Sequence, residues 1–242
     1  MQGLHSPGKG LSLEQGQIFT EHRNAFPEKA PTQIIIAGSS DNGGISPYVT
    51  APLLNTEAFI ADWREFYRQV HSMRVEPPRR LPKVVSGFNW GTLAPKGMKP
   101  ERAYEMAQSM FSCWRWCGNQ SLDEVINFDK EARTADKRAY AIFWEDSVEP
   151  LERLANVSAL QIAECQINTL GLTEMLLNHG WFYWKSGGKH LDIKNSTLCP
   201  ASRFFDGLVP RVSWIGLCSR LNVDGYDPGD ARGGLRSRQA VS

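Results

Sequence analysis

The chain has 242 residues and a mass of 27.2 kDa, and 41% of its residues are hydrophobic, so it can bury the core of one large domain or of one domain with an extension. A formal net charge of +1, with acids and bases interspersed, excludes the strongly basic surface that is typical of nucleic-acid-binding proteins. No apolar run approaches the length of a membrane span, and the first residues lack the layout of a secretory signal.

The first third of the chain predicts an extension followed by a helix. Residues 1–30 are polar and rich in Gly and Pro, which favours an arm, and residues 33–50 favour a β-hairpin. Asn55 or Thr56 can cap a helix that runs to about Val70 with one apolar face. We expect residues 1–80 to form an N-terminal extension or an attachment or oligomerisation module, and residues 81–242 to form the main domain. An extra layer on a single domain is an equal alternative.

The middle of the chain predicts helices and strands in alternation. Residues 84–90 favour a strand followed by a loop. Pro100 begins a helix whose Met and aromatic side chains recur at helical spacing up to the stop at Gly118. A capping box that starts at Ser121 opens a second helix to about Arg133. Aromatic and β-branched runs at 140–144 and 181–184 predict strands.

Residues 199–242 have neither a helical period nor sustained alternation, and turn-forming residues recur every few positions. A backbone that bends so often needs anchors in a core, and its remaining side chains face outward. We therefore predict a surface of binding loops held on a rigid body.

Catalytic motifs with a recognisable spacing are missing from the sequence. The cysteine count is five, which cannot complete an intrachain disulfide framework, and Cys113 and Cys117 fit buried thiols on one side of a helix better than metal ligands. The aspartates of the last forty residues could bind a structural calcium ion. Solvated turn carboxylates are the favoured interpretation, so no cofactor is expected; these aspartates are Asp206, Asp224, Asp227 and Asp230.

Several short motifs occur in the order found in one known family. Residues 113–118 (CWRWCG) are followed by the capped segment 120–125, and residues 168–184 resemble the family motif N-x-x-G-L-x-D-M. Residues 210–214 (PRVSW) resemble its R-G-G-S-W motif, and residues 234–236 (GLR) resemble its terminal G-F-R. Over residues 84–242 the chain thus resembles the formylglycine-generating-enzyme branch of the C-type lectin fold. The resemblance implies an α+β fold with two helices packed on small antiparallel sheets and a loop-rich C-terminal half.

Two functional classes share that branch. The oxidising enzymes use a pair of cysteines after the R-G-G-S-W motif, whereas this chain offers only Cys218 there. The variable proteins of diversity-generating retroelements have a tail in which fixed and changeable residues alternate, and residues 218–236 are similar to it. The resemblance to these variable proteins implies the following ligand-binding, variable positions: Phe205, Asp206, Leu208, Arg211, Ser213, Ile215, Leu217, Asn222, Asp224, Tyr226, Asp227, Asp230 and Arg232.

The same resemblance implies fixed scaffold positions at Trp214, Arg220, Gly234 and Arg236. We expect a non-enzymatic protein that binds a protein or glycan receptor on a cell surface, at a phage tail tip or on a cell, with no nucleic-acid partner. Whether it forms a homo-oligomer is left open. The alternatives are a non-catalytic structural member of the fold and an oxidoreductase that is similar to the formylglycine-generating enzyme.

Overall fold

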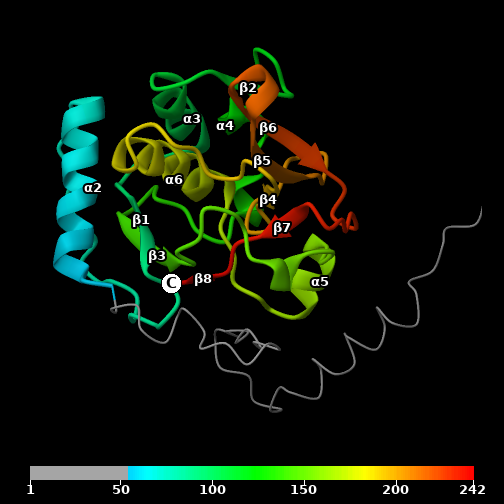
Figure 1. The fold of residues 1–242 in the computed structure, drawn as a ribbon, viewed down its shortest axis with the longest axis horizontal. Helices are drawn as coiled ribbons and strands as arrows, with labels where there is room; N and C mark the ends of the chain where they lie inside the picture. The colour runs from blue at the N-terminus through cyan, green and yellow to red at the C-terminus, as the bar shows by residue number, and fades with distance from the viewer. Residues whose placement is uncertain (1–53) are drawn as a thin grey trace, which may run out of the picture. The chain divides into compact units, whose positions relative to one another are not determined.

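The computed structural model describes residues 54–242, which adopt an α+β fold (Figure 1). Its helices are α2 (Thr56–His71), α3 (Pro100–Gln108), α4 (Leu122–Val125), α5 (Ala159–Glu164) and α6 (Leu172–Lys185), with short 3-10 turns η1 (Phe128–Lys130), η2 (Glu152–Leu154) and η3 (Gly216–Cys218). Its strands are β1 (Trp90–Ala94), β2 (Cys113–Arg115), β3 (Tyr140–Trp144), β4 (Ser196–Leu198), β5 (Val209–Ile215), β6 (Arg220–Tyr226), β7 (Leu235–Ser237) and β8 (Ala240–Val241). The arm and hairpin expected before residue 51 lie outside the described residues.

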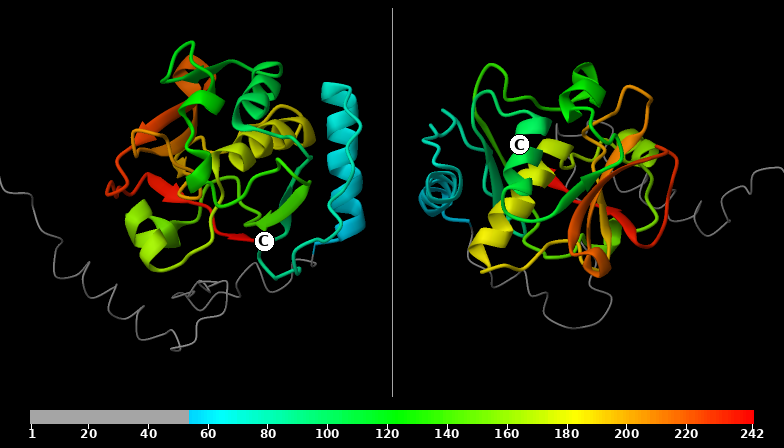
Figure 2. Two further views of the ribbon diagram at one scale, coloured as in Figure 1. Left: turned by 180° about the vertical axis from the view of Figure 1, so that it is seen from behind. Right: turned by 90° about the horizontal axis from the view of Figure 1, so that it is seen from above.

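The strands form two sheets, with the orders β1-β3-β8 and β2-β6-β5-β4-β7. Most neighbours are antiparallel, but β2 pairs with β6 and β4 pairs with β7 in parallel. The α+β class is confirmed, and the expectation of purely antiparallel sheets is wrong. Helix α6 lies between α2 on one side and the β5–β6 pair on the other in all three ribbon views (Figure 2).

Helix α2 confirms the prediction for residues 55–70. Its buried face packs into the same core as β1 and α6. The indole of Trp63 donates a hydrogen bond to the Gly91 carbonyl at 2.8 Å, and the Tyr67 hydroxyl donates to the Leu93 carbonyl at 2.8 Å. The Pro-rich segment 77–82 therefore does not separate α2 from the rest of the described chain, and α2 is a layer on the main body.

The N-terminus of α2 provides a test of local stabilisation. The side chain of Asn55 accepts hydrogen bonds from the N–H groups of Glu57 (3.0 Å) and Ala58 (3.1 Å). Asn55→Ala should lower the free energy of unfolding by about 1 kcal/mol because these donors lose their acceptor. Urea denaturation of Asn55→Ala and of the conservative Asn55→Asp measures this, and an Asp variant as unstable as the Ala variant would contradict the capping role.

Helix α6 corrects the strand predicted at residues 181–184. Every residue from Leu172 to Phe182 is buried, including the polar Glu174, Asn178 and His179, so this part of the helix has no solvent-facing side. A helix of that kind shows no 3.6-residue period, and its aromatic density was misread as a strand. Glu174 caps the N-terminus of α6, because its carboxylate accepts a hydrogen bond from the Gly171 N–H.

The two helices expected in sequence are both shorter than predicted. Helix α3 begins at Pro100 as expected but ends at Gln108, and residues 113–115 form β2 instead. Cys113 and Cys117 therefore do not share a helix face. Helix α4 begins with the predicted capping box but ends at Val125. Next to it, the Asn127 N–H bonds the Arg203 carbonyl at 2.8 Å, so backbone pairing with a distant segment replaces the next helical turn.

The strand at 140–144 is confirmed as β3, whereas the segment 84–90 holds a loop that leads into a strand, the reverse of the predicted order. Within residues 54–242, no helix combines the length and the apolar character that crossing a bilayer requires.

The end of the chain is fixed by a buried arginine. Arg238 is 0% exposed and donates hydrogen bonds to the carbonyls of Ser147 (2.6 Å) and Val148 (2.8 Å) and to the carboxylate of Asp192 (2.5 Å). Its guanidinium also lies over the ring of Trp144. Arg238 therefore joins the last strands to two loops that are far away in the sequence.

Candidate binding face on strands β5 and β6

The expectation of loops throughout residues 199–242 is wrong for two segments, because strands β5 and β6 form a seven-residue antiparallel pair there. Opposite residues share a face of the sheet, and the facing alternates along each strand. One face carries Val212, which is opposite Val223, and Trp214, which is opposite Leu221. This inner face packs into the core.

The other face of the pair is the outer face. All expected variable positions that fall within the two strands lie on it: Arg211 opposite Asp224, Ser213 opposite Asn222, Ile215 opposite Arg220, and Tyr226 opposite Val209. The expected variable positions within β5 and β6 thus all lie on one face of the sheet. The exception in accessibility is Ser213, which is 2% exposed and so lies beneath its neighbours, out of reach of an outside ligand.

The remaining expected positions lie in the turns around the strand pair. Phe205 and Asp206 are exposed and Leu208 is half-buried in the turn before β5, and Leu217 in η3 is fully exposed. Asp227, Asp230 and Arg232 occupy the loop after β6, with Asp230 half-buried and the other two exposed. The turn that contains η3 therefore presents an apolar side chain directly to solvent, at the end of the outer face where Ile215 and Arg220 meet.

The turn interpretation is correct for Asp206 and Asp227 and wrong for Asp224, which lies within strand β6. Asp206 accepts a hydrogen bond from the Leu208 N–H at 3.0 Å, and Asp227 accepts one from the Gly229 N–H at 2.7 Å. Asp224 pairs with Arg211, and Asp230 contacts Arg232 at 3.4 Å. In the described part of the chain, no three His, Cys, Asp or Glu side chains gather as a metal site would require.

Contacts along the outer face hold its side chains in place. The guanidinium of Arg211 lies 4.7 Å from the Tyr226 ring centroid, and that of Arg232 lies 5.7 Å from it on the loop. Arg211 is at the same time paired with Asp224. The charges at the centre of the face are thus largely matched within the face.

One end of the outer face is covered and the other is open. Ala159 of α5 packs with Leu198, Val209 and Leu235, and Tyr226 packs against this small core. The open end runs from Arg211 and Asp224 towards η3, where a partner can reach the face.

The expected scaffold residues divide between the two faces. Trp214 lies on the inner face, where its ring stacks on His190 and meets the edge of Phe111. Burial, together with the nearby His179, lowers the pKa of His190 to about 4, so this stacked ring is neutral at pH 7. Arg220, by contrast, lies on the outer face, bonds Asn222 at 3.0 Å and covers Trp114, which makes it part of the candidate surface.

The two other expected scaffold residues have minor contacts. Gly234 is exposed, and Arg236 is half-buried and donates to the carbonyls of Gly233 (2.9 Å) and Pro150 (3.3 Å). The arginine that is fully buried is Arg238, two positions later in the chain.

Sequence reasoning missed Trp114 and Trp116 as surface residues. Strand β2 pairs in parallel with β6, which sets Trp114 beside Asn222 on the outer face. Trp114 is 38% exposed and Trp116 is 37% exposed. The sequence assigned Trp114 to a helical core stripe; its alternation with Cys113 and Arg115 is the only local signal of a strand.

The thiols are distributed as buried and surface groups. Cys117 and Cys199 are buried, Cys113 and Cys165 are half-buried, and Cys218 in η3 is exposed. Burial raises the pKa of the Cys113 thiol to about 12, which makes it an inert thiol at neutral pH. Cys218 is therefore the cysteine of the described residues that a reagent in solution reaches most easily.

Comparisons of the chain with protein-family models, with curated proteins and with solved structures find no match.

Proposed function

We propose that the protein is a variable protein of a diversity-generating retroelement with a C-type lectin fold, and that it binds a surface receptor through the open end of the outer face. The receptor is a protein or a glycan on a cell, met at a phage tail tip or by a cell-surface protein. The single observation that carries the proposal is the face of the β5–β6 pair on which each tail residue lies. Positions expected to change share one side of β5 and β6, while the other side is core.

The structure of the face suits recognition for a physical reason. Binding loops that are already ordered lose less conformational freedom on contact, so more of the interaction energy appears as affinity. The strand pairing and the Arg211–Asp224 ion pair order this face before any partner arrives. At the open end, Trp114 and Arg220 provide the aromatic and arginine side chains that are enriched in binding hot spots.

Two neighbouring residues of β6 test whether the outer face tolerates change. Asn222→Ser should alter the free energy of unfolding by about 0.5 kcal/mol or less, because its side chain is half-buried at the surface. Val223→Ser should cost about 2 kcal/mol or more, because it removes buried methyl groups and buries a hydroxyl. Urea denaturation of both variants measures the contrast. Equal losses at the two sites would contradict a changeable face on a fixed scaffold.

Binding itself is tested with two displayed libraries of the full chain. One library varies the outer positions Ile215, Leu217 and Asn222, and the matched control varies the inner positions Val212, Leu221 and Val223. The outer library should give folded clones that bind different immobilised glycoproteins, and the inner library should give mostly unfolded clones. Folded outer clones without any binders would count against a recognition role.

The neighbouring DNA gives an independent test of the retroelement. A reverse transcriptase gene beside a near-copy of the codons for residues 203–238, differing at adenines, is the expected result. Its absence would leave the alternative of a non-catalytic structural member of the fold.

A second candidate function is an oxidoreductase similar to the formylglycine-generating enzyme, and the exposed Cys218 in η3 is the observation that favours it. No second cysteine occurs among residues 219–242 to complete the pair that such chemistry uses. Under this alternative, Cys218→Ser abolishes copper binding and turnover. Under the binding proposal, the wild-type protein shows no metal-dependent turnover.

A further inference from the structure

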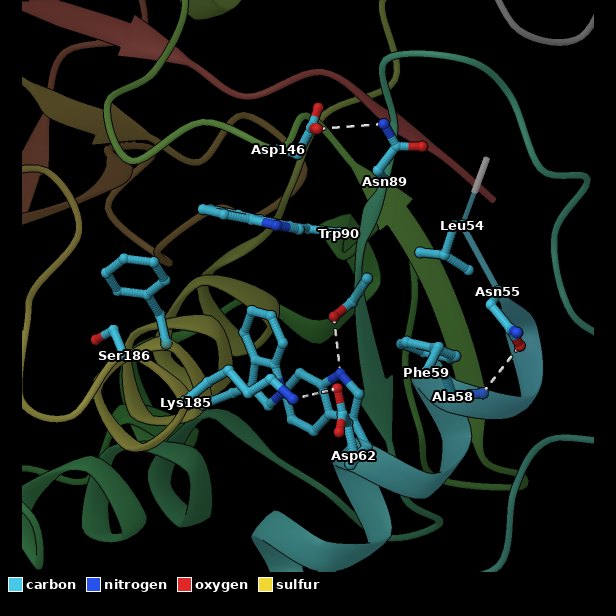
Figure 3. Close-up of a pocket in the computed structure, with 14 residues that line it drawn as sticks. Leu54, Asn55, Ala58, Phe59, Asp62, Asn89, Trp90, Asp146, Lys185 and Ser186 are labelled. Atoms are coloured by element: carbon cyan, nitrogen blue, oxygen red, sulfur yellow. Dashed lines mark hydrogen bonds and ion pairs between the residues drawn. The ribbon is translucent and has the colours of Figure 1, made fainter. Parts of the chain in front are cut away.

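A cavity of about 530 Å³ opens between α2, β1 and α6 (Figure 3). Helix α2 lies on the side of α6 opposite to β5 and β6 (Figure 2). Its volume is in the range of small-molecule sites. Because α6 lies between the cavity and the outer face, the cavity is a separate site, and its ligand goes beyond the proposed receptor binding.

Each of the three elements contributes aromatic rings to the cavity walls. Trp63 of α2 and Trp181 of α6 stack with ring centroids 5.8 Å apart, and Trp90 of β1 lies 5.4 Å from Phe182. Phe59 completes the lining from α2 (Figure 3). The faces of such rings carry negative charge density and attract cations.

The charged side chains of the lining leave one carboxylate without a cationic partner. Lys185 is bound to Asp62 at 2.7 Å, so these two charges offset each other. Among the described residues, Asp146 accepts a hydrogen bond only from the neutral amide of Asn89, at 3.1 Å (Figure 3). The lining therefore has an excess of one negative charge.

Unpartnered polar atoms in the same lining indicate what a ligand must offer. Within residues 54–242, the second carboxylate oxygen of Asp146 and the carbonyl oxygen of Asn89 have no hydrogen-bond donor, and the indole N–H of Trp181 has no acceptor. Buried polar atoms are costly when they are unpaired. A donor-rich cationic group would satisfy the two oxygens, and one ligand oxygen would satisfy the indole.

We propose that this cavity binds a small organic ammonium ion with an aromatic body and a hydroxyl group. The ligand ring packs against Trp90 and Phe182 at the cavity surface, and the ammonium group donates to Asp146. Aromatic walls with a single unmatched carboxylate select this class over anions, for which Asp146 is repulsive, and over neutral aromatics, which leave its charge unpaired.

Isothermal titration calorimetry with the full chain tests the ligand class by means of three matched probes. Tyramine has the ring, the hydroxyl and the ammonium group; 4-ethylphenol lacks the ammonium group; 3-(4-hydroxyphenyl)propionate replaces it with a carboxylate. Tyramine should bind about tenfold or more tightly than 4-ethylphenol, and the carboxylate should bind most weakly. Equal affinity for all three, or no binding of tyramine, would overturn the proposal.

Two pairs of variants locate the binding. Asp146→Asn should weaken tyramine binding about tenfold or more and leave 4-ethylphenol unaffected, while Asp129→Asn, on the exposed turn η1, should change neither. Ala58→Trp places a large ring at the cavity wall and should abolish binding, whereas Ala61→Trp, exposed on the same helix and outside the lining, should not. Undiminished binding in a folded Ala58→Trp variant would show that tyramine binds elsewhere and would refute the assignment.

Discussion

Arg238→Leu should lower the free energy of unfolding by about 3–5 kcal/mol, because removing one partner of a buried ion pair leaves the other charge buried and uncompensated. Asp192, which is 0% exposed, would lose its arginine partner and retain the contact with His179 at 3.6 Å. The carbonyls of Ser147 and Val148 would each lose a donor. Urea denaturation at pH 7 measures the loss.

Arg236→Leu is the matched control, since Arg236 is only half-buried and bonds two loop carbonyls. Its cost should be about 1 kcal/mol or less, as for a surface hydrogen bond. A loss at Arg236 equal to that at Arg238 would show that the terminal G-x-R arginine, and not Arg238, fixes the tail.

The loss in free energy of unfolding caused by Arg238→Leu should also depend on pH. Burial by itself raises the pKa of Asp192, but the charge of Arg238 and the contact with His179 lower it below its ordinary 3.8. In the wild type, the stabilisation from the Arg238–Asp192 pair is present at pH values above the ordinary aspartate pKa of 3.8 and is lost as the pH falls below it. In the variant, the uncompensated Asp192 is more easily protonated, so the difference between the two proteins should narrow as pH falls towards 4. A constant difference would contradict the assignment of the loss to Asp192.

Glu131→Gln should stabilise the protein above pH 8 by about 1–3 kcal/mol, after allowance for partial exposure. Burial raises the pKa of Glu131 to about 8; the hydrogen bond from Ser202 opposes the shift, and the negative charge of Glu174 adds to it. One carboxylate oxygen of Glu131 is buried without a donor among the described residues. Glutamine imitates the protonated form that the folded state prefers.

The pH dependence follows from the direction of this shift. The folded state holds the Glu131 proton more tightly than the unfolded state, so its contribution to stability is full below the ordinary pKa of 4.5 and is lost as pH rises towards 8. Glu131→Gln should therefore flatten the fall in the free energy of unfolding between pH 5 and pH 8. Burial also raises the pKa of Glu145, to about 7 against the opposing charges of Arg153 and Arg238, and that group accounts for a remaining slope.

Glu76→Gln provides the control for a glutamate that is almost fully exposed. Its stability should follow the wild type at every pH. If Glu131→Gln also followed the wild type from pH 5 to pH 8, then Glu131 would not be the buried acid that its surroundings indicate.

Elements whose signal is local were predictable from sequence. Asn55 and Ser121 cap helices where their side chains can reach the next N–H groups, and Pro100 begins a helix that needs no donor at that position. The strand at 140–144 follows from β-branched and aromatic residues. Each of these outcomes depends on interactions within a few residues.

Elements whose partners are far away in the sequence were mispredicted. Trp114 follows a helical pattern but lies in a strand, because β6, more than a hundred residues later, offers it a pairing edge. Residues 181–184 form the end of a helix that is surrounded by core on every side, so no polar face reveals its period. The cavity between α2 and α6 likewise has no sequence motif, because its lining comes from α2, β1, α6 and the loop after β3, which are far apart in the sequence.

The sequence alone determined the α+β class, the helix starts and the recurrent turns of the tail, because capping and turn formation act between near neighbours. The tertiary structure alone decided which arginine is buried, where the helices end, and that the positions of β5 and β6 expected to vary share one face beside Trp114. Those outcomes depend on pairing between strands and on burial against distant residues, and burial is a property of the whole packed chain.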